Sequence, residues 1–260
     1  MGEDCAVLVC SCDKNEDLWK MFFYYMKQYW KDCSYPIYLN TESRKYVDSW
    51  FEVKTFGLFP NGDKDRWSYR LRKTLEQMKE NYVLILLEDF FLRQEVDRDE
   101  ISLCLKRMKE NDNIAVFLFD PTPGPNTVSE YDRYEKKAKK APFRMSLQAG
   151  LWNKKHLLHF IRDHENPWQF ESWGSIRSRR YKQDFYALKE GAPRVFTYPS
   201  GGVLADNRWH CKAACRFIEE DWGIDLEATR GVYERGDPRK TELRHRSFAK
   251  KCIEVCRSLI

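Results

Sequence analysis

The sequence lacks any apolar run that approaches the roughly 20 residues needed to cross a lipid bilayer. Charged residues make up 33% of its 260 residues, and the mean hydropathy is -0.71. Together these values exclude a polytopic membrane protein. The N-terminal segment MGEDCAVLVC carries acids where a secretory signal carries basic residues, so we expect no export signal there. The sequence therefore predicts a cytoplasmic protein.

Several short motifs are absent as well. No GxGxxG follows the first apolar run, GxxxxGK[ST] occurs nowhere, and no GxSxG nucleophile motif is present. The nine cysteines form no CxxC pair, and His156, His159 and His164 do not have HExxH spacing. We therefore expect reduced thiols and ordinary surface or interface histidines instead of a zinc site.

Positive charge is in excess, with a net charge of +5. It gathers after Tyr131 in the clusters EKKAKK, RSRRYK and RHRSFAKK. Such clusters suit an anionic ligand or anionic lipid headgroups, although a charge run is usually a solvated face. A peripheral contact with the inner face of the cell membrane is compatible with this distribution.

Apolar periodicity predicts alternating strands and helices in the first part of the chain. Strands are expected over 5–11, 35–39, 50–56, 82–87 and 114–119, and amphipathic helices over 18–30, 68–79 and 97–110. Crossover helices of this kind imply an α/β fold with a mostly parallel central sheet flanked by helices. Because the sequence has no internal repeat and no convincing linker, we expect a single domain, 1–260.

The second part of the chain gives a less regular pattern. We expect 120–142 to be part helix and part loop, and 165–180 to be an irregular loop. Further strands are predicted over 143–151 and 194–198, and helices over 153–163, 207–221 and 242–259.

Polar residues follow the predicted strands where they end, namely Ser11 and Asp13, Asn40 to Glu42, and Glu88-Asp89. Ligands of open α/β sheets bind beyond the carboxyl ends of the strands. Two adjacent acids after an apolar strand are costly to bury unpaired. A divalent metal that bridges to a diphosphate would satisfy them. The alternative, which has about equal weight on the pattern alone, is that Asp89 caps the turn.

The segment ENPWQFE, Glu165–Glu171, has the most unusual local composition. A carboxylate in a partly apolar wall has a raised pKa, which suits a general base. The alternative is a rigid loop whose Trp168 fills the core, and from the residues alone this alternative is slightly favoured.

Seven segments, taken in order between Val7 and Glu171, together resemble the GT-A-type glycosyltransferases of bacterial capsule and lipopolysaccharide gene clusters. They are SCDKNEDLW, FFYYMKQYW, PIYLNTES, RWSYRL, VLILLEDFFL, SLQAGLWNKKHLL and ENPWQFE. The resemblance covers about two thirds of the chain. It implies a GT-A-like, Rossmann-like fold with a nucleotide-binding half, 1–120, and an acceptor half with C-terminal helices, 121–260.

The resemblance also implies roles for particular residues. The residues that it places around the nucleoside and ribose are Ser11, Asp13, Asn40, Thr41, Glu42, Trp67, Ser68 and Arg70. Glu88-Asp89 falls where such enzymes carry an Asp-x-Asp motif, but the motif is incomplete here. Asp89 is thus the best candidate ligand for Mn²⁺ or Mg²⁺, and metal dependence stays open.

Gln148 to Trp152 are implied as the floor of the donor-sugar and acceptor site, and His210 and Arg230-Gly231 as a segment that closes over the diphosphate. Glu171 resembles the general base of inverting enzymes, with Glu165 in reserve. The implied function is a hexosyltransferase that moves a sugar from a nucleotide sugar, a UDP-sugar, to a saccharide or lipid-linked saccharide in surface polysaccharide synthesis. The alternative is a noncatalytic carbohydrate- or nucleic-acid-binding module. Because the tryptophans occupy mostly apolar periodic positions, we expect no nucleic acid partner.

Overall fold

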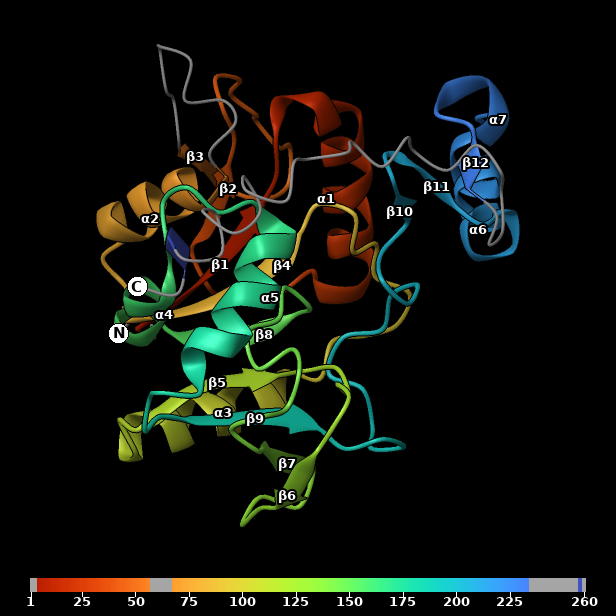
Figure 1. Ribbon diagram of the computed structural model, residues 1–260. Coiled ribbons are helices and arrows are strands. Elements are labelled where there is room, and N and C mark those ends of the chain that lie inside the picture. The colour runs from red at the N-terminus through yellow and green to blue at the C-terminus, as the bar shows by residue number, and fades with distance from the viewer. Residues whose placement is uncertain (1–3, 57–66, 234–256, 259–260) are drawn as a thin grey trace.

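The computed structural model describes residues 4–56, 67–233 and 257–258. Its main element is a nine-stranded sheet in the order β3-β2-β1-β4-β8-β5-β9-β7-β6, with helices against both faces (Figure 1). A smaller three-stranded sheet, β10-β11-β12, lies with the last helices beside α1 (Figure 1).

The first half follows the predicted alternation of strands and helices. Its elements are β1 (Cys5–Cys10), α1 (Glu16–Trp30), β2 (Ile37–Asn40), β3 (Val53–Phe56), α2 (Trp67–Gln77), β4 (Tyr82–Leu87), α3 (Arg98–Glu110) and β5 (Ile114–Leu118). β1 pairs in parallel with both β2 and β4. The predicted α/β fold with a central sheet flanked by helices is therefore confirmed, since apolar strands joined by crossover helices have few other ways to bury both faces. Across the whole nine-stranded sheet the pairing is mixed, with four parallel and four antiparallel pairings.

Alternate residues of the central strands face the two helical layers. Val7 and Val9 of β1 belong to the core cluster that contains the apolar faces of α1 and α3. Ala6 and Leu8 belong to the opposite cluster, with α2 and the helices α4 (Lys154–Phe160) and α5 (Pro167–Ser178). This alternation explains why β1 is apolar at every position.

One antiparallel strand brings the second half to the edge of the sheet where β1 and β4 end. β8 (Gly150–Asn153) lies between β4 and β5 and runs against both. Its first residue, Gly150, pairs with Ile85, so the segment just before β8 lies at the edge where β4 ends. Gln148 and Glu88 therefore meet at one edge, although they are far apart in the sequence.

Five of the predictions for the second half are wrong in whole or in part. The stretch 120–142 holds a hairpin, β6 (Asn126–Val128) and β7 (Tyr134–Lys137), in place of a helix. Residues 143–149 do not continue β8, and 194–198 makes isolated backbone bonds to the Arg93–Asp97 stretch instead of a strand. A strand that the sequence did not predict lies ten residues earlier: β9 (Asp184–Leu188) pairs with β5 and β7.

The fourth error concerns 165–180, which is the helix α5 and not a loop. Asn166 accepts the backbone N–H of Gln169, and the Gln169 side chain returns a bond to the Asn166 backbone, which forms a capping box. Pro167 occupies the first turn, where proline favours a helix start. The helix predicted over 153–163 is confirmed, although α4 ends at Phe160.

The C-terminal part begins with short strands where a helix from 207 was predicted. Its elements are β10 (Leu204–Ala205), β11 (Arg208–His210), α6 (Lys212–Trp222), α7 (Leu226–Thr229) and β12 (Val232–Tyr233). The helix predicted over 242–259 lies outside the described residues, apart from 257–258.

Seven cysteines belong to the described ranges, and all seven are free thiols. Within the same ranges, no helix has both the length and the apolar character of a membrane span.

Candidate functional site

A cavity of about 390 Å³ opens where β1 and β4 end. This volume lies within the roughly 300–1,000 Å³ that is usual for small-molecule sites. The first half of the chain lines it through residues next to β1 and β4 and through Trp67, and the second half through Gln148, the start of α5 and the segment 201–207. The cavity is thus assembled from both halves, and we call it the donor cavity after the role that we propose for it below.

The acidic pair Glu88-Asp89 forms part of its wall. The two residues are only 8% and 9% exposed. Glu88 Oε1 accepts a hydrogen bond from Asn15 Nδ2 at 2.5 Å, and Asn15 Oδ1 in turn accepts one from Arg230 at 3.2 Å. The hydrogen bond to the Asp89 side chain is weaker, because the distance from Leu204 N to Asp89 Oδ2 is long, 3.4 Å.

Burial raises the pKa of both carboxyl groups above their usual values. For Glu88, the hydrogen bond from Asn15 partly offsets this shift. For Asp89, the neighbouring charge of Glu88 adds to the effect of burial. Asp89 is therefore a carboxyl group whose negative charge the described residues compensate poorly.

Gly202 leaves room for the side chain of Asp89. Its φ is +88°, and a Cβ placed on it would lie 2.1 Å from Asp89 Oδ2. The backbone closes around the same residue, since Val203 N–H donates to the Asp89 carbonyl oxygen at 2.9 Å. Only glycine satisfies both the left-handed conformation and the close approach.

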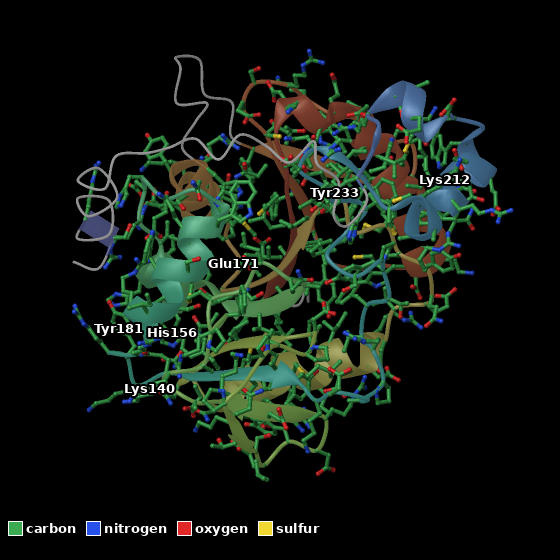
Figure 2. The ribbon with its side chains drawn as sticks, turned by 45° about the vertical axis from the view of Figure 1, so that its right-hand side comes forward. Lys140, His156, Glu171, Tyr181, Lys212 and Tyr233 are labelled. Carbon is green, nitrogen blue, oxygen red and sulfur yellow. The ribbon has the colours of Figure 1, made fainter. Side chains whose placement is uncertain are left out.

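Glu171 enters the cavity from α5. Its Oε1 accepts the backbone N–H of Leu147 at 2.7 Å and the hydroxyl of Ser146 at 3.3 Å. Burial raises the pKa of this carboxyl above its usual value, against these two hydrogen bonds. Figure 2 shows Glu171 near the middle of the molecule, whereas His156 and Tyr181 lie toward its edge. The group has the environment of a general base.

Gln148 reaches the cavity beside a tyrosine that the sequence patterns did not single out. The Tyr198 hydroxyl lies 3.2 Å from Gln148 Oε1 and contacts Asp120 at closer range. The Tyr198 ring stacks on Phe90 at 4.1 Å between centroids. Because Phe90 directly follows the acidic pair, this stack holds the Glu88-Asp89 turn and Gln148 in one unit.

The predicted nucleoside residues divide into two groups. Ser11 and Trp67 line the donor cavity, and Trp19 Nε1 donates to the Ser11 hydroxyl at 2.6 Å. The others stand outside the cavity lining and build its surroundings: Asp13 accepts backbone N–H groups of the 42–44 turn, Asn40 bonds to Thr74, Thr41 bonds to Arg44, Glu42 pairs with Arg70, and Ser68 is buried in α2.

Two further residues lie away from the cavity. Trp152 is 1% exposed within the core beside α2 and α4 and does not form the cavity floor. Glu165 is fully buried and forms a two-pronged ion pair with Arg177, with N–O distances of 2.8 and 3.0 Å. This pair joins the start of α5 to its end, so we do not retain Glu165 as a candidate base. Trp168, in contrast, is 74% exposed at the cavity and does not fill the core.

The segment 201–207 is the main part of the site that sequence patterns missed. Gly201, Leu204, Asp206 and Asn207 line the donor cavity, together with Asn15 from the turn after β1. Gly201, Gly202, Asp206 and Asn207 all have positive φ. The dipeptides Gly-Gly and Asp-Asn are the available signal, since these residue types favour turns with left-handed backbone. His210, nearby, donates its backbone N–H to Val203 at 2.7 Å.

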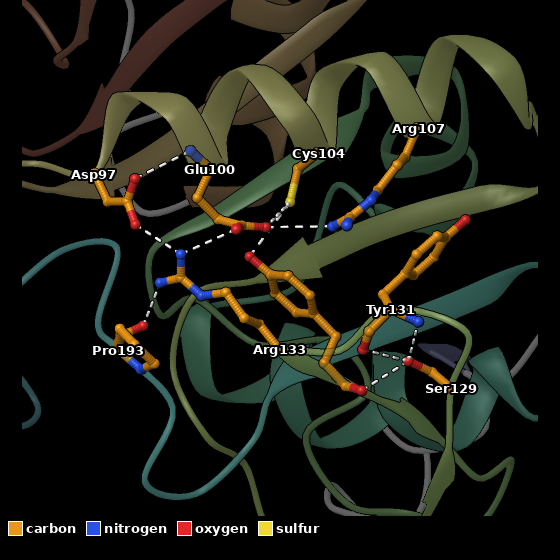
Figure 3. A network of polar contacts seen from close by, with 9 residues as sticks. Asp97, Glu100, Cys104, Arg107, Ser129, Tyr131, Arg133 and Pro193 are labelled. Atoms are coloured by element: carbon orange, nitrogen blue, oxygen red, sulfur yellow. Dashed lines mark hydrogen bonds and ion pairs between the residues drawn. The ribbon is translucent and has the colours of Figure 1, made fainter.

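A partly buried arginine network supports the loop that leads into this segment. Arg133 Nη1 contacts Asp97 and Glu100 at 2.6 and 2.9 Å, while its Nη2 donates to the Pro193 carbonyl oxygen (Figure 3). Arg107 completes the pairing of Glu100 at 3.3 Å. The network ties α3 and the start of β7 to the chain just before Arg194 and Tyr198.

The donor cavity fits a hard divalent cation as part of a ligand complex. Four carboxylates line it, those of Glu88, Asp89, Glu171 and Asp206, and within the described ranges no lysine or arginine does. No cluster of three or more His, Cys, Asp or Glu suited to a metal occurs in those ranges. A cation here would thus take only part of its oxygen ligands from the protein and the rest from a bound phosphate or water.

No family model and no curated protein matches this chain. Among solved structures, S. aureus TarS matches with a TM-score of 0.45 and 10% identity, over 71% of this chain and 36% of that chain. TarS 1-349 in complex with UDP matches with a TM-score of 0.45 and 8% identity, over 72% and 60%. CMP:2-keto-3-deoxy-manno-octonic acid synthetase complexed with CTP gives a TM-score of 0.42 and 8% identity, over 71% and 88%.

This chain thus spans about a third of the length of the TarS structure that it matches, 36%. At these identities and TM-scores, the likeness assigns no residue, ligand or activity to this chain.

Proposed function

We propose that this protein is a glycosyltransferase that moves a sugar from a nucleotide sugar, most simply a UDP-sugar, to a saccharide or lipid-linked saccharide. One observation carries the proposal. A single cavity holds a buried acidic pair at the end of a parallel strand and, on a different element, a separate carboxylate held by a backbone N–H. The first suits a phosphate-bound cation and the second suits a base.

The charges of the donor cavity support a metal-bound donor. An unaccompanied diphosphate would face four carboxylates, with no cation among the described lining residues. A divalent cation held by Asp89, with Glu88 nearby, would reverse this repulsion and stabilise the negative charge that the leaving diphosphate develops. Trp67 and Trp168 provide aromatic surfaces for the base or the sugar.

Glu171 performs the proton transfer in this proposal. The acceptor hydroxyl oxygen attacks the anomeric carbon, the bond from that carbon to the diphosphate oxygen breaks, and the hydroxyl proton passes to Glu171. Oε1 is engaged by Leu147 and Ser146, so we assign proton acceptance to Oε2. Attack on the side opposite the leaving group inverts the anomeric configuration.

Membrane contact and a place in surface polysaccharide synthesis stay predictions. The cluster EKKAKK is not a uniform basic patch, because Lys137 is 2% exposed and Lys136 pairs with Asp184 at 2.7 Å. In RSRRYK, Arg177 belongs to the buried pair with Glu165. RHRSFAKK lies outside the described residues.

The direct test is donor hydrolysis by the purified protein. UDP-glucose, UDP-galactose and UDP-N-acetylglucosamine are compared with and without Mn²⁺, in the wild type, in Asp89→Asn and in a control, Asp99→Asn, at an exposed position of α3. We expect metal-dependent release of UDP that Asp89→Asn loses and Asp99→Asn keeps. If the protein binds glycan but neither hydrolyses the donor nor binds nucleotide, it is instead a noncatalytic module.

A further inference from the structure

A second cavity adjoins the donor cavity at the proposed base. It has a volume of about 480 Å³ and shares Gln148, Glu171 and Gly201 with the donor cavity. A third hollow of about 520 Å³ continues from it, since the two share Pro121–Pro123 and Glu190. We call these two hollows together the lateral groove. It runs from Glu171 past the loop after β5 toward the β6–β7 hairpin.

Resting on the proposed function, we propose that the lateral groove binds the acceptor, and that this acceptor is an electrically neutral oligosaccharide more than one sugar long. The junction at Glu171 carries the first part of this inference. A base that removes the acceptor proton must face both substrates, and Glu171 lines both cavities. Each hollow alone has the volume of a small-molecule site, so the groove has room beyond a single ring.

The charges of the lateral groove determine the class of saccharide. Its lining holds four carboxylates, Asp120, Glu135, Glu171 and Glu190, and one described cation, Arg194. Arg194 is already paired, with its Nη1 at 2.5 Å from Asp120 Oδ1. A uronic acid or a phosphorylated sugar would therefore meet a lining in which negative charge is in excess, and this disfavours acidic acceptors.

One buried cation stands behind the groove, and it does not reverse this balance. Lys137 is 2% exposed, and its Nζ donates to Thr122 Oγ1 at 2.5 Å and to the Pro123 carbonyl oxygen at 3.2 Å. Burial lowers the pKa of Lys137 to about 8, so at neutral pH it still counts as one positive charge, against four carboxylates in the lining. Those contacts direct the ammonium group to the loop that forms the groove wall.

Phe143 supplies a surface for stacking against a sugar ring. It lines the groove beside Glu171, is 43% exposed, and has a φ of 51°. A left-handed backbone at a bulky, exposed apolar residue is costly and tends to persist where function requires it. The hydroxyl groups of Ser146 and Ser200 line the same hollow and can bond to sugar hydroxyls. An aromatic face with hydroxyls and carboxylates around it suits an uncharged polyol.

The test uses direct binding of defined trisaccharides in the absence of donor, measured by calorimetry on the full chain. The neutral probes are trisaccharides of glucose and of N-acetylglucosamine, and the acidic probe is the trisaccharide of galacturonic acid. We expect at least one neutral probe to bind more tightly than the acidic one. Phe143→Ala should weaken neutral binding about fivefold, and Phe143→Trp should retain it. The control Leu103→Ala removes a similarly exposed apolar side chain from α3.

A charge reversal gives the sharper result. Glu190→Lys should strengthen binding of the galacturonic acid trisaccharide about fivefold or more, whereas Glu110→Lys, at the exposed end of α3, should leave it unchanged. Equal binding of acidic and neutral probes to the wild type, no binding of any probe, or no response to Phe143→Ala would overturn the inference.

Failure of the inference is distinguishable from failure of the proposed function. If the wild type hydrolyses UDP-sugars and Phe143→Ala has the same acceptor KM, the glycosyltransferase function stands and the groove is not the acceptor site. If the wild type neither binds UDP nor hydrolyses the donor, the proposed transferase function is refuted, and so is the acceptor role of the groove.

Discussion

Replacing Glu171 by glutamine removes one charge from the junction of the two cavities and keeps the side-chain shape. The amide oxygen can still accept from Leu147 N–H and Ser146, which now contact Oε1 at 2.7 and 3.3 Å. Hydrogen bonds to charged acceptors contribute about 1.5–3 kcal/mol and those to neutral ones about 0.5–1.5 kcal/mol. Because the variant also relieves the burial of a charge, we expect its free energy of unfolding to change by no more than about 1 kcal/mol.

The effect on turnover should be far larger. A positioned general base contributes about 10²- to 10⁴-fold to rate, which corresponds to about 2.7–5.5 kcal/mol in the activation free energy. We therefore expect kcat for transfer to fall by at least about 100-fold, with little change in UDP affinity. The assay is the initial rate of UDP release with acceptor present, measured together with thermal unfolding.

The pH profile tests the same role independently. The pKa of Glu171 is raised by burial, so wild-type kcat/KM should fall as the pH drops through that raised pKa, because the protonated carboxyl cannot accept a proton. Glu171→Gln should lack this limb, and Glu110→Gln, at an exposed site on α3, should retain it. Wild-type turnover and an unchanged pH profile in Glu171→Gln would refute the reasoning.

Three further substitutions test how the site is built. The raised pKa of Asp89 means that its contribution to stability falls as the pH rises from the ordinary carboxyl range to that raised value. Asp89→Asn should therefore be more stable than the wild type at neutral pH, by about 1–3 kcal/mol in metal-free buffer, and equal melting temperatures would contradict this. Gly202→Ala should lower stability by more than Gly191→Ala, because both glycines have φ near +80°, but only at Gly202 would the Cβ meet Asp89, at 2.1 Å; equal losses in urea unfolding would contradict the close approach. Glu165→Gln should lower the free energy of unfolding by about 3–5 kcal/mol and Glu76→Gln, from an exposed pair, by less than about 1 kcal/mol; a small loss at Glu165 would argue against the buried pair.

The sequence predicts the first half of the fold well, for a physical reason. β1 and β4 are short, continuously apolar runs, and α1 and α3 each carry one apolar face. The surface that each element buries can therefore be predicted from its own residues. Parallel order follows from the crossover helices, and it places the polar strand ends at one edge.

The missed elements are those whose signal is not apolar periodicity. α5 has no pronounced apolar face, and its start is marked only by the Asn166–Gln169 capping box and Pro167. The β6–β7 hairpin is short, and its first strand has mostly exposed side chains. The stretch 194–198 is mostly apolar, yet only isolated backbone bonds to 93–97 hold it.

The candidate site shows the same division. Glu88-Asp89 could be placed from the end of one strand, and Glu171 from the composition around it. The contact between Gly202 and Asp89 could not, because it joins residues more than a hundred positions apart through a loop. Asn40 and Glu42 lie at the end of β2 as predicted. Their side chains bond to Thr74 and Arg70 of α2, however, and this pairing could not be predicted from the sequence.

The most direct test of the central claim is a calorimetric titration of UDP into the wild type and into Asp89→Asn, each with and without Mn²⁺. We predict that the wild type binds UDP only with Mn²⁺ and that Asp89→Asn weakens this binding by at least about tenfold, or about 1.4 kcal/mol. No UDP binding by the wild type in Mn²⁺, or equal affinities of the two proteins, would contradict a phosphate-bound cation at the end of β4.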